Sequence, residues 1–165
     1  MTAHDTELVV GFMNTIDLET GLDLLDREAS YAGWCRERSL APGDLDAARS
    51  VRDALRNAVV RRTGTVRAMT DGELRPVRLR ATLTPDGVEV GGPDAPSAVI
   101  AAAARITSAG RWARVKICPG DDCGEAYYDR SRNSSRVWCD MAVCGNLAKV
   151  RANRARKHDG PGAKR

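Results

Sequence analysis

Four cysteines near the C-terminal end constrain the fold of this chain more than any other feature. Cys118 and Cys123 enclose four residues, fifteen residues follow, and Cys139 and Cys144 again enclose four. Two close pairs at this separation are typical of a four-thiolate zinc site, because each short loop presents two sulfurs and zinc favours a tetrahedron of soft ligands. We therefore predict that Cys118, Cys123, Cys139 and Cys144 bind one structural zinc ion.

The same four cysteines leave other interpretations open. An iron–sulfur cluster also uses four cysteines, although with other usual spacings. A zinc site that releases its metal on oxidation, or a set of free thiols or disulfides, would use the same residues. A catalytic zinc is disfavoured, because four protein ligands leave no open position. The fifth cysteine, Cys35, stands alone beside Trp34 and is expected to be a small buried hydrophobic residue.

Hydrophobic periodicity predicts a mainly helical N-terminal region. Apolar residues recur at helical spacing over 5–17, 20–37, 44–62 and 97–108. In the third of these helices, Arg49, Arg52 and Arg56 are assigned to a solvated face. Alternating apolar residues and an Asp-Gly pair predict a β-hairpin with strands at 77–83 and 88–90, the first strand having one wet face.

These patterns together predict an α+β fold that is mainly helical. An N-terminal helical domain with a β-hairpin is placed at 1–112, a four-cysteine zinc-finger module with a C-terminal basic helix at 113–158, and a flexible basic tail at 159–165. The apolar runs are too short for a signal peptide or a membrane span, so we expect a soluble, cytoplasmic protein with no membrane partner. The oligomeric state is left open.

The excess of positive charge is confined to the last third of the chain. Residues 1–117 contain 16 Lys and Arg residues against 16 Asp and Glu residues, whereas residues 118–165 contain 10 against 6. This asymmetry favours a polyanion as the partner of the C-terminal part, although a basic tail that only aids solubility has the same composition.

A basic helix is predicted directly after the last cysteine pair, with Asp140 as its N-cap. Its cations, together with arginines between the two cysteine pairs, suit contacts with nucleic-acid phosphates, and a solvated helix end is the alternative. The candidate nucleic-acid-binding residues are Arg130, Arg132, Arg136, Asn146, Lys149, Arg151, Arg154, Arg156 and Lys157. The nearby Tyr127, Tyr128 and Trp138 are assigned to packing around the metal rather than to base stacking.

No arrangement of residues typical of an enzyme is visible. The two histidines, His4 and His158, lie near the termini, and no phosphate-binding glycine-rich motif, nucleophile elbow or carboxylate pair stands out. We therefore expect a protein without catalytic activity.

The stretch YYDRSRNSSRVWCDMAVCGNLAKVRANRARK at 127–157 resembles the CGNR zinc finger, which is named for a Cys-Gly-Asn-Arg motif at its last cysteine. Upstream, ELVVGFMNTID, YAGWCRERSL and VRDALRNAV resemble the ABATE domain that precedes this finger. The resemblance implies a stress-related transcription regulator with zinc as cofactor, DNA as partner of the finger and a small-molecule ligand for the N-terminal domain. The positions that carry the finger's pattern are Asp129, Ser131, Arg132, Asn133, Arg136, Trp138, Gly145, Asn146 and Lys149.

The chain departs from this pattern at one position, where CGNL places Leu147 instead of the motif arginine. If that arginine contacts phosphate, this protein lacks one cation at the contact, which lowers the salt dependence of binding by about one unit. If it supports the zinc site, an apolar residue has replaced it there.

Two functions of different classes follow. One is a zinc-containing DNA-binding protein that regulates transcription. The other is a structural zinc module that mediates protein or RNA interactions without sequence-specific DNA binding.

Overall fold

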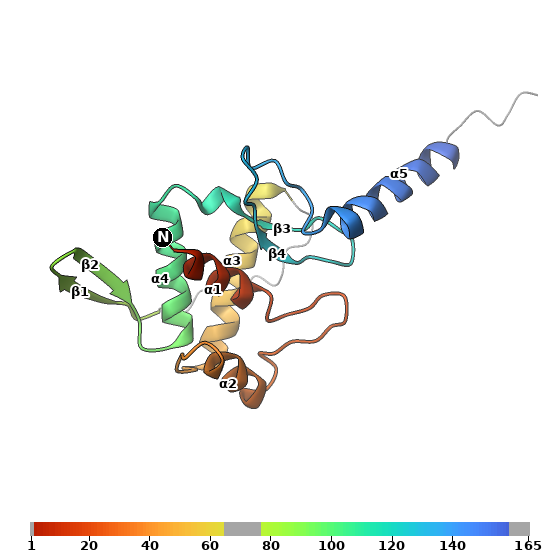
Figure 1. Ribbon diagram of the computed structural model, residues 1–165. Coiled ribbons are helices and arrows are strands. Elements are labelled where there is room, and N and C mark those ends of the chain that lie inside the picture. The colour runs from red at the N-terminus through yellow and green to blue at the C-terminus, as the bar shows by residue number, and fades with distance from the viewer. Residues whose placement is uncertain (1, 65–76, 159–165) are drawn as a thin grey trace, which may run out of the picture.

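The computed structural model describes residues 2–64 and 77–158 and has an α+β fold dominated by helices (Figure 1). Helices α1 (Ala3–Met13), α3 (Leu45–Thr63) and α4 (Ala95–Ser108) pack against one another, and α2 (Glu28–Arg36) lies below them in the view. Each of the three packed helices begins at a side-chain cap: Thr2, Asp44 and Asp94 accept hydrogen bonds from backbone amides of the first turn. The predicted class is confirmed.

The second predicted helix, at 20–37, is shorter in the structure because its first part forms a turn. Residues ahead of Glu28 lie outside α2, and Gly21 adopts a left-handed conformation with φ of 75°. The Asp17 carboxylate accepts hydrogen bonds from the amides of Glu19 and Thr20, and short polar side chains that bind local amides in this way compete with a helix. Leu22, an apolar residue within the predicted helix at 20–37, is 62% exposed.

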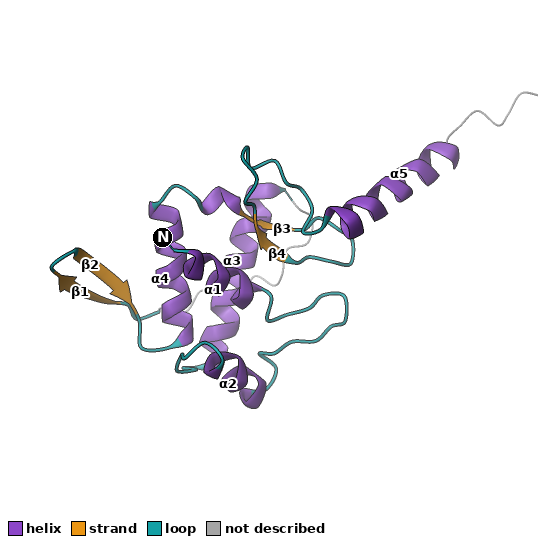
Figure 2. Cartoon of the chain, in the orientation of Figure 1, coloured by secondary structure: helices purple, strands orange, loops and turns teal. Residues whose placement is uncertain are grey.

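The predicted hairpin is present as β1 (Arg80–Thr84) and β2 (Gly87–Gly91), paired antiparallel, and it projects from the helices in Figure 2. Its apolar face is not covered by the described part of the chain, since Leu83 and Val88, which face each other across the strands, are 85% and 62% exposed. The alternation therefore predicted the strands correctly, but not burial of one face. The hairpin is held at its base by Arg105, which donates to the carbonyl of Val90 and pairs with the buried Asp5 of α1.

A second small sheet belongs to the same hydrophobic core as the helices. After the 3-10 turn η1 (Trp112–Arg114), strand β3 (Val115–Ile117) pairs antiparallel with β4 (Ala126–Tyr128). Val115, Ile117 and Ala126 are buried in one cluster with side chains of α1, α3 and α4. The predicted boundary at 112/113 stays a prediction, but residues on both sides of it build one core.

Hydrogen bonds from the helices fix this sheet in place. The Asn14 side chain, at the end of α1, donates to the carbonyl of Ala126 and accepts from its amide, both at 2.8 Å, and so extends the edge of β4. Arg62 of α3 donates to the carbonyls of Trp112 and Val115.

The last elements leave the body of the molecule. The π-helical turn η2 (Met141–Gly145) leads into α5 (Asn146–His158), which extends away from the other helices (Figure 1). Its main contacts are with η2. Among the described residues, no helix is long and apolar enough to cross a membrane. The predicted tail at 159–165 lies outside the described residues.

Because Asn14 satisfies two backbone groups of the buried Ala126, replacing it should destabilise the protein. We expect Asn14→Ala to lower the free energy of unfolding by about 2 kcal/mol, since a donor and an acceptor would lose their partners. Urea denaturation followed by far-UV circular dichroism measures this. Asn133→Ala, at an exposed position of the loop after β4, is the matched control and should leave the midpoint unchanged. Equal midpoints for both variants would show that the Asn14 pairing does not hold β4.

Candidate metal centre and basic helix

The four predicted metal ligands come together at one point of the structure. Cys118 follows β3, Cys123 precedes β4, Cys139 precedes η2 and Cys144 lies within η2. Their four sulfur atoms all lie within 4.8 Å of one another. The Sγ–Sγ distance is 3.4 Å between Cys123 and Cys139 and 3.6 Å between Cys139 and Cys144.

These separations fit a single tetrahedral ion. Zn–S bonds of about 2.3 Å in a tetrahedron place sulfurs about 3.8 Å apart, close to the observed values. In an iron–sulfur cluster the cysteines bind different irons, so their sulfurs would be more widely spaced. Burial raises the pKa of the buried Cys118 thiol, but hydrogen bonds from the amides of Cys139 and Gly120 and from the thiols of Cys139 and Cys123 lower the pKa below its ordinary value.

Comparison with known protein families agrees with this geometry. Residues 114–157 match the CGNR zinc finger. Zinc is accordingly the metal that the four cysteines are built to bind. Among curated proteins, none matches the chain. The matched range leaves residues 1–113 outside it, so the resemblance of the N-terminal part to an ABATE domain stays a prediction.

The second cysteine pair of the CGNR zinc finger is positioned by the N-cap of η2. As predicted, the Asp140 carboxylate accepts hydrogen bonds, from the amides of Ala142 and Val143 at 2.6 and 3.2 Å. The amide of Gly145 donates to the carbonyl of Asp140, which closes the wider π-helical turn around Cys144. A side chain on Gly145 would come within 3.1 Å of the Trp138 ring, so the motif glycine allows that ring to approach the turn.

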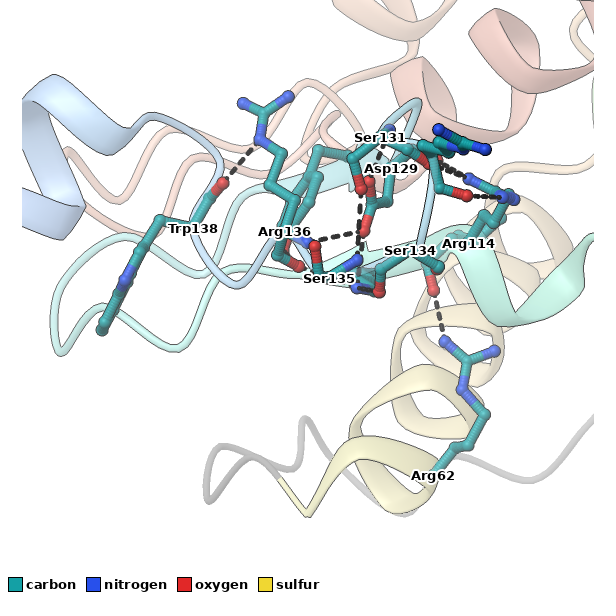
Figure 3. A network of polar contacts seen from close by, with 12 residues as sticks. Arg62, Arg114, Asp129, Ser131, Ser134, Ser135, Arg136 and Trp138 are labelled. Atoms are coloured by element: carbon teal, nitrogen blue, oxygen red, sulfur yellow. Dashed lines mark hydrogen bonds and ion pairs between the residues drawn. The ribbon is translucent and has the colours of Figure 1, made fainter.

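The loop between the cysteine pairs is built around the fully buried carboxylate of Asp129 (Figure 3). Lys116 of β3 donates to it at 2.7 Å, and the amides of Ser131 and Arg136 donate at 2.8 and 2.9 Å. Burial alone would raise the pKa of Asp129, but these hydrogen bonds hold it well below its usual value. Arg114 completes the network by donating to the carbonyls of the loop itself.

Two arginines predicted to be solvated are buried instead. Arg52 is 3% exposed and binds the carboxylates of Asp23 and Asp53, and Arg56 is 2% exposed. Their positions explain the error, because they lie four and eight residues after Ala48 and so share its buried helix face. Arg49 alone keeps the predicted exposure in part, with an ion pair to Asp46 at 3.0 Å.

Arg56 links the helical body to the metal site. Its guanidinium donates to the carbonyl of Met13 at 2.9 Å and to that of Gly124, directly after Cys123, at 2.7 Å. Gly124 has φ of 61°, and a Cβ there would collide with Leu18. Burial and the nearby Arg52 lower the pKa of Arg56 to about 10, while Asp53 and the Cys123 sulfur act in the opposite direction. Arg56 is therefore a buried cation beside a cluster of thiolates.

Most of the candidate nucleic-acid-binding residues lie on α5, and the others lie between the two cysteine pairs. Lys149, Arg154 and Arg156 are exposed on α5, as are Asn146 and Arg151. Arg151 pairs with Asp121 and, at 3.8 Å, with Asp122, which lie between the first two cysteines. The side chain of Lys157 lies outside the described residues.

The candidate arginines between the cysteine pairs precede α5 in the chain, and one of them makes contacts within its own loop. Arg136 donates to the carbonyl of Trp138 at 2.7 Å and covers the ring of the buried Tyr127 at 4.9 Å. Arg130 is 71% exposed and lies 3.8 Å from Glu7, and Arg132 is exposed. Tyr127 is buried as predicted, whereas Trp138 is only half-buried.

Leu147 lines a groove of about 520 Å³ that opens over the metal ligands between the first cysteine loop and α5. Trp138, Val143 and Arg151 line the same groove. The position where the family pattern has arginine therefore points towards the metal site rather than along the outer length of α5.

Removal of the metal should detach α5 but leave the core intact, because β3 and β4 pack with the helices. We expect Cys139→Ser to lose bound zinc and a share of the helical circular dichroism signal that corresponds to α5, with cooperative unfolding of the remainder retained. Metal analysis and limited proteolysis measure both. Cys35→Ser is the matched control: Cys35 is buried outside the cluster, so zinc should stay bound even if stability falls. Full zinc occupancy in Cys139→Ser would contradict the site.

Replacing Arg56 should weaken zinc binding without touching a ligand. We expect Arg56→Met to reduce zinc affinity about 10-fold or more, as for other groups that support metal ligands, because the thiolates lose a buried cation and Gly124 loses a donor. Competition with a chromophoric chelator measures the affinity. Arg49→Met, at a half-buried position two turns earlier in the same helix, is the control. An unchanged zinc affinity in a folded Arg56→Met protein would refute this coupling.

Proposed function

We propose that this chain is a DNA-binding protein that regulates transcription and has no catalytic role, with the zinc site holding α5 as the element that contacts DNA. The observation that carries this proposal is the surface of α5. The helix contains Lys149, Arg151, Arg154, Arg156 and Lys157 and no acidic residue. A helix of 13 residues is about 20 Å long, enough to follow several phosphates along a groove.

The cationic side chains on two sides of α5 differ in whether they form ion pairs with acidic residues. Lys149, Asn153 and Arg156 lie at helical positions i, i+4 and i+7 and so share one face. Arg156 donates to Asn153 on that face, and neither cation pairs with an acidic side chain among the described residues. Arg151 lies on another side of the helix and is already bound to Asp121. The face of Lys149 and Arg156 is thus the one that we propose to contact phosphates.

A second function is supported by apolar side chains on the same segment. Val143, Leu147 and Val150 are 56%, 52% and 39% exposed, so the described part of the chain does not fully cover this apolar edge. An apolar edge bounded by cations is also suited to a protein partner with an acidic surface. RNA or protein binding by a structural zinc module is therefore the alternative.

An electrophoretic mobility-shift series on zinc-loaded protein tests DNA binding. We expect binding to duplex DNA that weakens steeply with salt, and we expect Lys149→Ala/Arg156→Ala to lower the salt slope by about two units, one for each phosphate contact. The control Arg151→Ala should change the slope less, because its charge is already paired.

The outcomes separate the two functions. Absent or salt-independent binding to duplex DNA would refute the proposal. Retained binding to an acidic protein after nuclease treatment, sensitive to Leu147→Asp but not to the double variant, would favour the alternative.

A further inference from the structure

A cavity of about 420 Å³ lies at the junction of α1, η1 and the loop after β4, away from the cysteine cluster. Four arginines line it: Arg111, Arg114, Arg130 and Arg132. The N-terminal end of α1 contributes Thr2 and Ala3, and the Asp5 carboxylate caps the backbone amide of Thr2 at this end of the helix. No acidic side chain is among the residues that line this cavity.

The charge of this cluster is poorly balanced by the protein. Arg111 and Arg132 form no ion pair with any residue in the described ranges, and Arg130 has only the exposed Glu7 at 3.8 Å. The nearby acidic side chains form ion pairs with other residues, since the buried Asp129 pairs with Lys116 and Asp5 pairs with Arg105. Guanidinium groups gathered around one cavity repel one another unless an anion lies between them.

The cluster is also fixed in shape. Arg114 donates to the carbonyls of Asp129 and Ser131 at 2.9 and 2.7 Å, and Asp129 holds the amide of Ser131 at 2.8 Å. These bonds define the loop that carries Arg130 and Arg132 before any ligand arrives. Tyr128 lines the same cavity, and its buried hydroxyl has no hydrogen-bond partner among the described residues. A buried polar group of this kind indicates a site for water or a ligand.

We propose that this cavity is a phosphate-binding site in which Arg111 and Arg132 are the principal ligands. One guanidinium group can form two parallel hydrogen bonds to the oxygens of a phosphate. Several arginines from different segments can surround the same phosphate. The phosphate belongs either to a small molecule or to the backbone of bound DNA. The first source does not depend on the proposed function, whereas the second would extend the DNA contact to the end of α1.

Isothermal titration of the zinc-loaded full chain with inorganic pyrophosphate, at fixed ionic strength in chloride buffer, tests the site. We expect binding that is weakened at least 10-fold by Arg111→Gln and by Arg132→Gln. Arg80→Gln, an exposed arginine of the β1–β2 hairpin, is the matched control and should bind like the parent. Neither Arg111 nor Arg132 has a side-chain hydrogen bond to lose within the described structure, so both variants should fold; thermal melting verifies this.

A parallel arm measures duplex DNA binding by the same variants over a salt series. Pyrophosphate binding that is lost in both cavity variants, and kept in Lys149→Ala/Arg156→Ala, supports a small phosphorylated ligand even if DNA binding fails. A salt slope lowered by about one unit in Arg111→Gln but not in Arg80→Gln, without pyrophosphate binding, supports DNA phosphate as the source. Pyrophosphate binding unaffected by both cavity variants, or no effect in either arm, overturns the proposal.

Discussion

The buried guanidinium of Arg56 is the interaction on which the arrangement of this molecule most depends. It comes from the middle of α3, and it donates at the same time to the end of α1 and to the backbone beside a metal ligand. A buried cation is costly unless its donors are used and a negative charge lies nearby, and four thiolates carry more negative charge than one zinc ion neutralises. We therefore expect the helical core and the metal centre to stabilise each other through this side chain.

The finger is accordingly not an appendage on the helical body. Its first cysteine loop connects the two strands of a sheet whose inward side chains belong to the main core, and Asn14 and Arg62 bind the backbone of that sheet. Its second half, from Cys139 through α5, leaves the body, and we expect the metal and the ion pairs of Arg151 to hold it there. This division places the rigid part of the site against the core and leaves a basic helix outside it.

The sides of α5 differ in whether their positive charges are paired with acidic side chains. The acidic pair between the first two cysteines engages Arg151, which draws one side of the helix towards the metal loop. Lys149 and Arg156, on another side, form no ion pair with any acidic residue that the structure describes. Asp129 organises the preceding loop, because its buried carboxylate accepts hydrogen bonds from Lys116 and two backbone amides. Arg130 and Arg132 of that loop line the cavity beside α1.

Local spacing in the sequence was enough to predict the four-cysteine cluster, the helical class, the β-hairpin and the cap at Asp140. Each depends on a short pattern: thiols at the ends of short loops, apolar periodicity, an Asp-Gly turn and a carboxylate ahead of a helix. The sequence by itself did not determine the fate of polar side chains. The arginines at 52 and 56 are as hydrophilic as the exposed Arg49, and only the tertiary structure supplies the carboxylates and carbonyls that allow their burial. For the same reason the exposure of Leu83 and Val88, the gathering of Arg111 with Arg132, and the direction of Leu147 were decided by packing between segments far apart in the chain.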